Sequence, residues 1–234
     1  MSALSITNVH ASYGYAPVLR GINMKLKYNE ILTLLGRNGV GKTTFMRLLI
    51  GLLKPSLGKV EINGQVISGL PANRIARLGI SYVPQGRGIF PKLTVGENLI
   101  LGTRITGEKR PTIPEEVFTY FPILKERIKQ RAGSFSGGQQ QMLAIGRALC
   151  GKPKIMLLDE PSEGIQPNIV QQIGDLIVEI AEKSKISFLV VEQNLDLALR
   201  IANRCLVMDM GKIVYEGQPE EFKDEILVKK HLAI

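Results

Sequence analysis

The residues best suited to chemistry form a glycine-rich loop near the start of this 234-residue chain. The loop fits the pattern G-x-x-x-x-G-K-[ST] with Gly36, Arg37, Asn38, Gly39, Val40, Gly41, Lys42 and Thr43. Its glycines let successive backbone N–H groups point at phosphate oxygens, and the N-terminus of a following helix favours the same anion. Lys42 adds charge at the β- and γ-phosphates, the Thr43 hydroxyl can ligate Mg²⁺, and Thr44 offers one more donor.

A glycine-rich turn before a helix is the alternative interpretation of this loop. The complete motif, placed between an apolar run and a helical pattern, instead favours a nucleotide site. The motif leaves kinases, GTPases and ATPases open. A GTPase would carry an Asn-Lys-x-Asp base-reading motif, which the sequence lacks.

A pair of acids follows an apolar run much later in the chain. Residues 155–158 are Ile-Met-Leu-Leu, and Asp159 and Glu160 come next. A parallel strand would deliver both carboxylates to the edge of the sheet where the phosphate loop lies. Asp159 can then hold Mg²⁺ through water, and Glu160 can orient and deprotonate an attacking water. A solvated turn is the alternative for such a pair seen alone.

The third group is Ser136-Gly137-Gly138-Gln139, which precedes the acidic pair. Its two glycines expose backbone N–H groups at the start of a helix predicted over 139–149, and Ser136 adds a hydroxyl. Such a helix N-terminus binds anions. An ordinary N-capped helix would account for Ser136 but not for the two glycines beside the other motifs.

Hydrophobic periodicity indicates the elements that must hold these groups. The predicted strands are 4–9, 23–28, 30–35, 58–63, 80–83, 154–159, 186–192 and 204–209. The predicted helices are 42–50, 71–79, 139–149, 168–183, 194–201 and 220–232. Alternation of strands and helices predicts an α/β fold with a mostly parallel sheet covered by helices.

The character of the chain changes between about 87 and 150. No run there resembles a buried strand. Prolines separate short amphipathic segments at positions Pro91, Pro111, Pro114 and Pro122. We therefore expect one domain over 1–234. Its core and antiparallel β lobe would take about 1–86 and 151–234, and an inserted helical subdomain about 87–150.

Composition excludes several classes of protein. Apolar residues make up 44 %, which is enough for a core, and no run approaches the about 20 apolar residues of a membrane helix. The first residues lack the features of a signal peptide. Cys150 and Cys205 have no metal-site or disulfide spacing. The net charge of +9 is scattered, so no nucleic acid partner is expected.

The phosphate loop, Ser136–Gln139 and the acidic pair have the order and spacing of the ATP-binding cassette (ABC) ATPases, which the whole chain resembles. The resemblance implies a P-loop ATPase with a RecA-like parallel-sheet core, an antiparallel β subdomain and a helical subdomain carrying Ser136–Gln139. It implies ATP and Mg²⁺ as cofactors. It also implies head-to-tail pairing with a second ABC ATPase, either a sister chain or a copy, in which Ser136–Gln139 caps the γ-phosphate of the other subunit's ATP.

The same resemblance implies a place in an assembly. Two membrane permease subunits would be direct partners and a solute-binding protein an indirect one. The chain would then lie peripherally on the cytoplasmic face of the inner membrane.

Further positions match the family one by one. Tyr13, or failing it Tyr15, sits where an aromatic ring stacks on adenine. Gln85 matches a glutamine that reaches Mg²⁺ and the attacking water and links to the membrane subunit. Phe90 is expected either in contact with a coupling helix of that subunit or in the core. The resemblance thus implies catalytic roles for Glu160, Gln85 and Gln193, and metal contacts for Thr43, Gln85 and Asp159.

Three departures from the family pattern stand out. Phe135 replaces a leucine, which we expect to matter only for apolar packing. Gln193 replaces the usual histidine; its amide can donate a hydrogen bond to the γ-phosphate but carries no charge, so we expect an assisting role. Residues 162–167, Ser-Glu-Gly-Ile-Gln-Pro, replace the common Ser-Ala-Leu-Asp, and Gln166 takes the place of the aspartate.

These local sequences resemble importer ATPases for hydrophobic, branched-chain amino acids and for urea or short amides. Residues 35–40 and 163–167 favour the urea type, and 130–133 and 145–147 favour the amino acid type. A soluble ABC ATPase that acts on nucleic acid or ribosomes is the alternative, although such proteins typically fuse two cassettes or carry coiled-coil insertions. Half of an exporter is a third reading, but exporters often fuse a membrane domain to the cassette.

Overall fold

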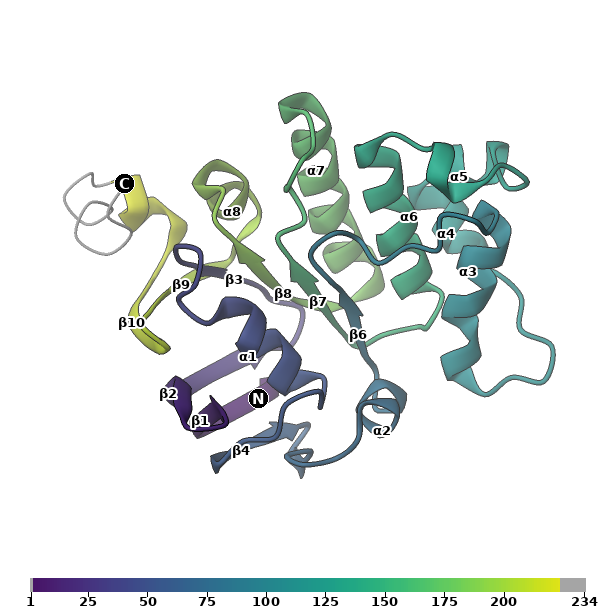
Figure 1. Cartoon of the computed structure of the whole chain (residues 1–234). Coiled ribbons are helices and arrows are strands. Elements are labelled where there is room, and N and C mark those ends of the chain that lie inside the picture. Colours follow the sequence, from purple (N-terminus) through teal and green to yellow (C-terminus); the bar gives the residue numbers. More distant parts are fainter. Residues whose placement is uncertain (1, 224–234) are drawn as a thin grey trace.

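The computed structural model describes residues 2–223, which form two β-sheets and several layers of helices (Figure 1). No helix among these residues has the length and apolar character needed to cross a membrane. The predicted helix over 220–232 is wrong at its start, because Pro219–Lys223 forms a 3₁₀ helix, η3. The remainder of that predicted helix lies outside the described residues.

The smaller sheet is antiparallel, with the order β2-β1-β4-β5. Its strands are β1 (Ser2–Tyr13), β2 (Ala16–Lys27), β4 (Leu57–Ile62) and β5 (Gln65–Val66). The first two strands are longer than their alternating segments predict. Their register shifts at several points, so bulges interrupt the strict two-residue alternation, and alternation alone does not indicate the full length of either strand.

The larger sheet has the order β10-β9-β3-β8-β7-β6. Its strands are β3 (Ile31–Leu35), β6 (Ile80–Val83), β7 (Ile155–Asp159), β8 (Ser187–Glu192), β9 (Arg204–Asp209) and β10 (Lys212–Gly217). All neighbours are parallel except β10, which runs antiparallel to β9 and was not predicted. Every residue of β3, β7 and β8 is buried, as expected of parallel strands covered on both faces.

The two faces of the parallel sheet belong to different cores. Along β7, Met156 and Leu158 pack with the helices that follow β6, whereas Ile155 and Leu157 pack with the antiparallel sheet and α1 (Lys42–Leu49). Side chains alternate across a strand, so one strand supplies both cores. The sheet thus fixes its own loop ends relative to both neighbouring layers.

The segment between β6 and β7 is helical. It contains α3 (Val95–Thr103), η1 (Arg104–Thr106), α4 (Glu115–Tyr120), α5 (Pro122–Glu126), η2 (Ala132–Ser134) and α6 (Gly137–Leu149), which Figure 1 shows grouped beside the sheet. The other helices are α2 (Ala72–Arg77), α7 (Pro167–Ser184) and α8 (Leu195–Ile201). The α/β fold class is confirmed; the exact subdomain limits near 86 and 151 stay a prediction.

Candidate functional site

The glycine-rich loop connects β3 to α1 and shapes a pocket of about 420 Å³. Gly41 takes the N-cap position of α1 with a φ of 112°, a left-handed conformation that disfavours side chains. The pocket lining combines this loop with residues from three other segments: Val18, Arg37, Asn38, Gly39, Gly41, Lys42, Thr43, Thr44, Gln85 and Glu160. The fold therefore brings the predicted loop, Gln85 and Glu160 together.

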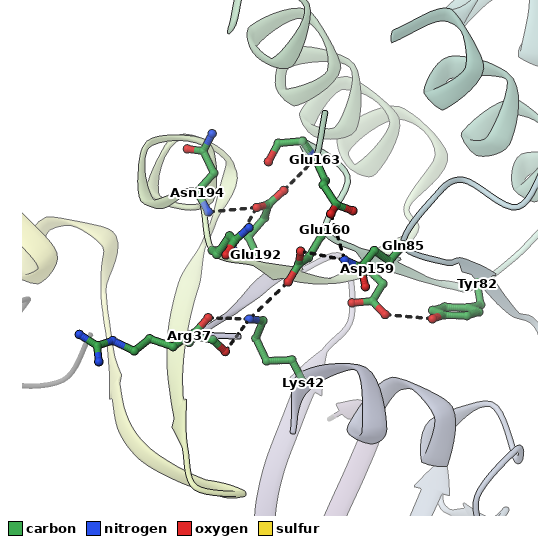
Figure 2. A network of polar contacts seen from close by, with 12 residues as sticks. Arg37, Lys42, Tyr82, Gln85, Asp159, Glu160, Glu163, Glu192 and Asn194 are labelled. Atoms are coloured by element: carbon green, nitrogen blue, oxygen red, sulfur yellow. Dashed lines mark hydrogen bonds and ion pairs between the residues drawn. The ribbon is translucent and has the colours of Figure 1, made fainter. Parts of the chain in front are cut away.

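The ammonium of Lys42 lies inside the loop. It donates to the carbonyl oxygens of Gly36 at 2.6 Å and Arg37 at 3.0 Å, and it lies 3.4 Å from Oε1 of Glu160 (Figure 2). The lysine and glutamate side chains of this ion pair are 3 % and 6 % exposed. Screening by water is weak at such a site, so the lysine charge acts strongly on a bound phosphate and on Glu160.

Asp159 ends β7 beside the loop and is 1 % exposed. Its Oδ2 accepts from the Tyr82 hydroxyl at 3.0 Å, and its buried Oδ1 has no hydrogen-bond partner. Burial raises the pKa of Asp159, although the hydrogen bond from Tyr82 and the nearby Thr43 hydroxyl oppose the rise. Burial also raises the pKa of Tyr82, so this hydroxyl keeps its proton and remains a donor.

An unpartnered carboxylate oxygen near a threonine hydroxyl suits a small divalent cation. Mg²⁺ prefers oxygen ligands and is usually held by one or two carboxylates together with phosphate oxygens. Asp159, Thr43 and the Gln85 carbonyl offer such a set. Residues 2–223 contain no group of three or more His, Cys, Asp or Glu side chains that would hold a metal unaided.

Gln85 extends toward two carboxylates. Its Nε2 donates to Oε2 of Glu160 at 3.4 Å and to Oε1 of Glu163 at 3.2 Å, and Figure 2 shows the amide between them. Glu163 had no assigned role in the sequence interpretation. The only feature of the sequence that points to Glu163 is its position three residues after Glu160.

The buried carboxylate of Glu192 organises the segment that carries Gln193. It accepts from the backbone N–H groups of Ser162 at 2.9 Å and of Gln193 and Asn194, both at 3.1 Å. Burial raises the pKa of Glu192, and these hydrogen bonds oppose the rise. The sequence interpretation missed this role, although a carboxylate at the end of an apolar strand is the signal that identified Asp159. The side chain of Gln193 is exposed.

Ser136–Gln139 form the first turn of α6. The Ser136 hydroxyl accepts from the N–H of Gln139, and the Gln139 side chain accepts from the N–H of Ser136, which makes a capping box. These four residues are not among the described residues that line the phosphate-loop pocket. Phe135 is buried in the core at 4 % exposure, as expected for a packing position.

Tyr13 and Tyr15 flank the turn between β1 and β2. Tyr13 is 46 % exposed and lies close to Arg47 of α1, and this neighbour raises the pKa of the arginine. Tyr15 is fully exposed. Within residues 2–223 neither ring lines the phosphate-loop pocket, so a role in holding adenine stays a prediction.

The fold and this loop arrangement define a nucleotide-binding ATPase of the cassette type. A family model described as "ABC transporter" matches residues 19–163. The chain belongs to this family and is an ABC ATPase, as the motifs predict.

The relatives share most of their length with this chain. It is 44 % identical over 90 % of its length, and 91 % of the relative, to the high-affinity branched-chain amino acid transport ATP-binding protein BraG of Pseudomonas aeruginosa. It is 35 % identical over 98 % of its length, and 96 % of the relative, to the lipopolysaccharide export system ATP-binding protein LptB of Haemophilus influenzae. A solved structure of a nucleotide-free ATP-binding cassette superposes with a TM-score of 0.88 at 28 % identity, covering 99 % of this chain and 97 % of that one.

Proposed function

We propose that this chain hydrolyses ATP to drive an importer of branched-chain amino acids. The observation that carries the solute class is the 44 % identity to a branched-chain amino acid transport protein, against 35 % to a protein of lipopolysaccharide export. The motif set of the sequence supports the same importer group. Urea or short amides remain the second solute class that its local sequences resemble.

Each residue of the site has a separate role in ATP hydrolysis. The loop N–H groups and Lys42 hold the β- and γ-phosphates, and Glu160 accepts the proton of the attacking water. The ammonium of Lys42 lies 3.4 Å from Oε1 of Glu160 and helps to fix the position of this carboxylate. Gln85 orients Glu160 through its amide, and Gln193 donates a hydrogen bond to the γ-phosphate. Mg²⁺ held by Asp159, Thr43 and Gln85 would neutralise charge on the phosphates.

ATP would join two ATPase subunits head to tail. The phosphate loop of each subunit holds one ATP, and the first turn of α6 of the other caps its γ-phosphate. Support comes from the capping box, which leaves the N–H groups of Gly137 and Gly138 at an anion-binding helix start. ATP drives the conformational change because it binds the closed pair more tightly than the open subunits.

A second surface groove suits a membrane permease. It has a volume of about 490 Å³ between β6, α3 and α6, with Phe90 and Leu101 exposed along it. The guanidinium of Arg147 lies 5.2 Å from the Phe90 ring centroid, and its buried Nη1 has no hydrogen-bond partner. We propose that a short permease helix with apolar residues and one acceptor oxygen binds here, which would hold the chain on the cytoplasmic face of the membrane.

Transport in cells tests this proposal. In cells that lack this chain, uptake of labelled leucine, isoleucine and valine should fall, and wild-type chain should restore it whereas Glu160→Gln should not. Labelled urea and lipopolysaccharide export are measured in parallel. Unchanged uptake of all three amino acids, with loss of urea uptake or of lipopolysaccharide export, would replace the proposed solute.

A further inference from the structure

Arg87 lies two residues after Gln85, at a place where three segments meet. Its Nη1 donates to Oε1 of Gln140 in α6 at 3.2 Å. Its Nη2 donates to the backbone oxygens of Glu163 at 3.2 Å and Gly164 at 3.4 Å. One planar guanidinium therefore connects the segment after β6, the start of α6 and the loop after Glu160.

The partner of Arg87 in α6 is itself tied to the Ser136 turn. Nε2 of Gln140 donates to the carbonyl oxygen of Phe135 at 3.0 Å, immediately before Ser136. The Gln140 amide thus accepts from the arginine with its oxygen and holds the residue before the capping box with its nitrogen. A shift of this helix start is transmitted directly to Arg87.

The other partners of Arg87 belong to the loop that carries the proposed base. The N–H of Glu163 donates to the carbonyl oxygen of Glu160 at 3.1 Å, which closes a tight turn. The side chain of Glu163 contacts Gln85. Fixing the carbonyl groups of Glu163 and Gly164 therefore limits the movement of Glu160.

Gly137 provides an independent observation of the same contact. A Cβ placed there would lie 3.1 Å from Nη2 of Arg87 and 3.2 Å from the Gly164 oxygen. Both distances are shorter than ordinary van der Waals separations. The glycine therefore permits α6, Arg87 and the loop to approach closely, in addition to exposing its N–H.

We propose that Arg87 is a positioning residue for ATP hydrolysis, which links the Ser136–Gln139 turn to Glu160 through Gln140 and the carbonyl groups of Glu163 and Gly164. Within residues 2–223, the side chain of Arg87 donates its hydrogen bonds to Gln140, Glu163 and Gly164, which do not line the phosphate-loop pocket. This inference rests on the two-subunit ATP site proposed above and is independent of the transported solute.

Steady-state ATP hydrolysis is measured with the full-length chain, in whichever assembly hydrolyses ATP. Comparing kcat with KM then distinguishes a role in positioning Glu160 from a role in binding ATP. Arg87→Ala should lower kcat by about tenfold to a hundredfold, the loss that follows misplacement of a catalytic group. KM for ATP and direct ATP affinity should stay at the wild-type values. Arg87→Lys should recover part of the rate, because one ammonium replaces only some of the donors.

A matched control and a double variant complete the test. Arg127→Ala removes an exposed arginine at the end of α5 and should leave kcat and KM unchanged. Gln140→Ala should lower kcat, and adding it to Arg87→Ala should cause little further loss because both act through one link. Wild-type kcat in Arg87→Ala, a loss explained by weaker ATP binding, or fully additive losses would overturn the inference.

Wild-type turnover in the same assay tests the ATP site itself. If the wild-type chain and Arg87→Ala hydrolyse ATP at the same rate, only the proposed role of Arg87 is overturned. Failure of the wild-type chain to hydrolyse ATP overturns the proposed function as well. Thermal unfolding of each variant identifies any loss of rate that comes from unfolding.

Discussion

Glu160 has a left-handed backbone conformation, with a φ of 50°, that residues other than glycine rarely adopt. Its N–H donates to the Val191 oxygen at 2.9 Å, and its carboxylate contacts Lys42 and Gln85. Such conformations cost about 1–3 kcal/mol and persist where the surroundings fix them, often at active sites. The geometry agrees with the role of proton acceptor that we propose.

Replacing this carboxylate separates hydrolysis from binding. Glu160→Gln keeps the shape of the side chain but removes the base, so turnover should fall by at least about a hundredfold. ATP binding should persist, because the loop N–H groups and Lys42 are unchanged. Single-turnover hydrolysis and equilibrium ATP binding measure the two effects. Glu126→Gln, at an exposed position of α5, is the control, and full turnover in Glu160→Gln would refute its role.

The roles of residues within one local motif could be predicted from the sequence. The roles of residues that come into contact only through the fold could not. The phosphate loop and Asp159-Glu160 carry their chemistry in consecutive positions, so the pattern alone identifies them. The hydrogen bonds of Arg87 to Gln140, of Glu192 to Ser162 and of Tyr82 to Asp159 join residues that are 53, 30 and 77 positions apart. Such contacts depend on the packing of neighbouring elements, which periodicity does not specify.

At the scale of elements, fully buried strands were the most predictable. β3, β7 and β8 are short apolar runs that end near glycine or charged residues, which identifies them without ambiguity. β10 was missed because it is an edge strand whose residues alternate between exposed and half-buried. Its apolar residues are consecutive rather than alternating with polar ones, so the two-residue period of a half-buried strand is absent, and pairing with β9 determines its conformation.

The start of α6 packs tightly against α7, which predicts a cost for any side chain at Gly138. A Cβ there would collide with Ile169. Alanine normally favours a helix over glycine by up to about 1 kcal/mol, whereas overpacking costs about 1–3 kcal/mol. Gly138→Ala should therefore lower the free energy of unfolding, as measured by urea denaturation.

A second substitution identifies the cause of that loss. Ile169→Ala removes the methyl group that the new Cβ would meet. The double variant should be more stable than the sum of the two single losses predicts, because the collision disappears. Simple additivity would mean that Gly138 is required for another reason.

For the whole molecule, the order of the motifs along the sequence predicted the α/β fold of an ABC ATPase. Two cores share the parallel sheet, and the loop ends of β3, β6, β7 and β8 bring Lys42, Gln85 and Glu160 together, with the segment of Gln193 joined to the loop that carries Glu160. The turn that carries Ser136 lies outside the pocket lining of the same chain. This separation is the physical reason to propose that a second subunit completes the site.

Light scattering measures whether ATP joins two ATPase subunits, as proposed above. Glu160→Gln chain, alone and mixed with any ATPase subunit that co-purifies with it, is measured with ATP and with ADP. We expect ATP to double the mass in one of these preparations, ADP to leave it unchanged, and a further Ser136→Arg substitution to abolish the effect. A mass that ATP does not change in either preparation, or that ADP doubles equally, would contradict ATP-dependent pairing of the subunits.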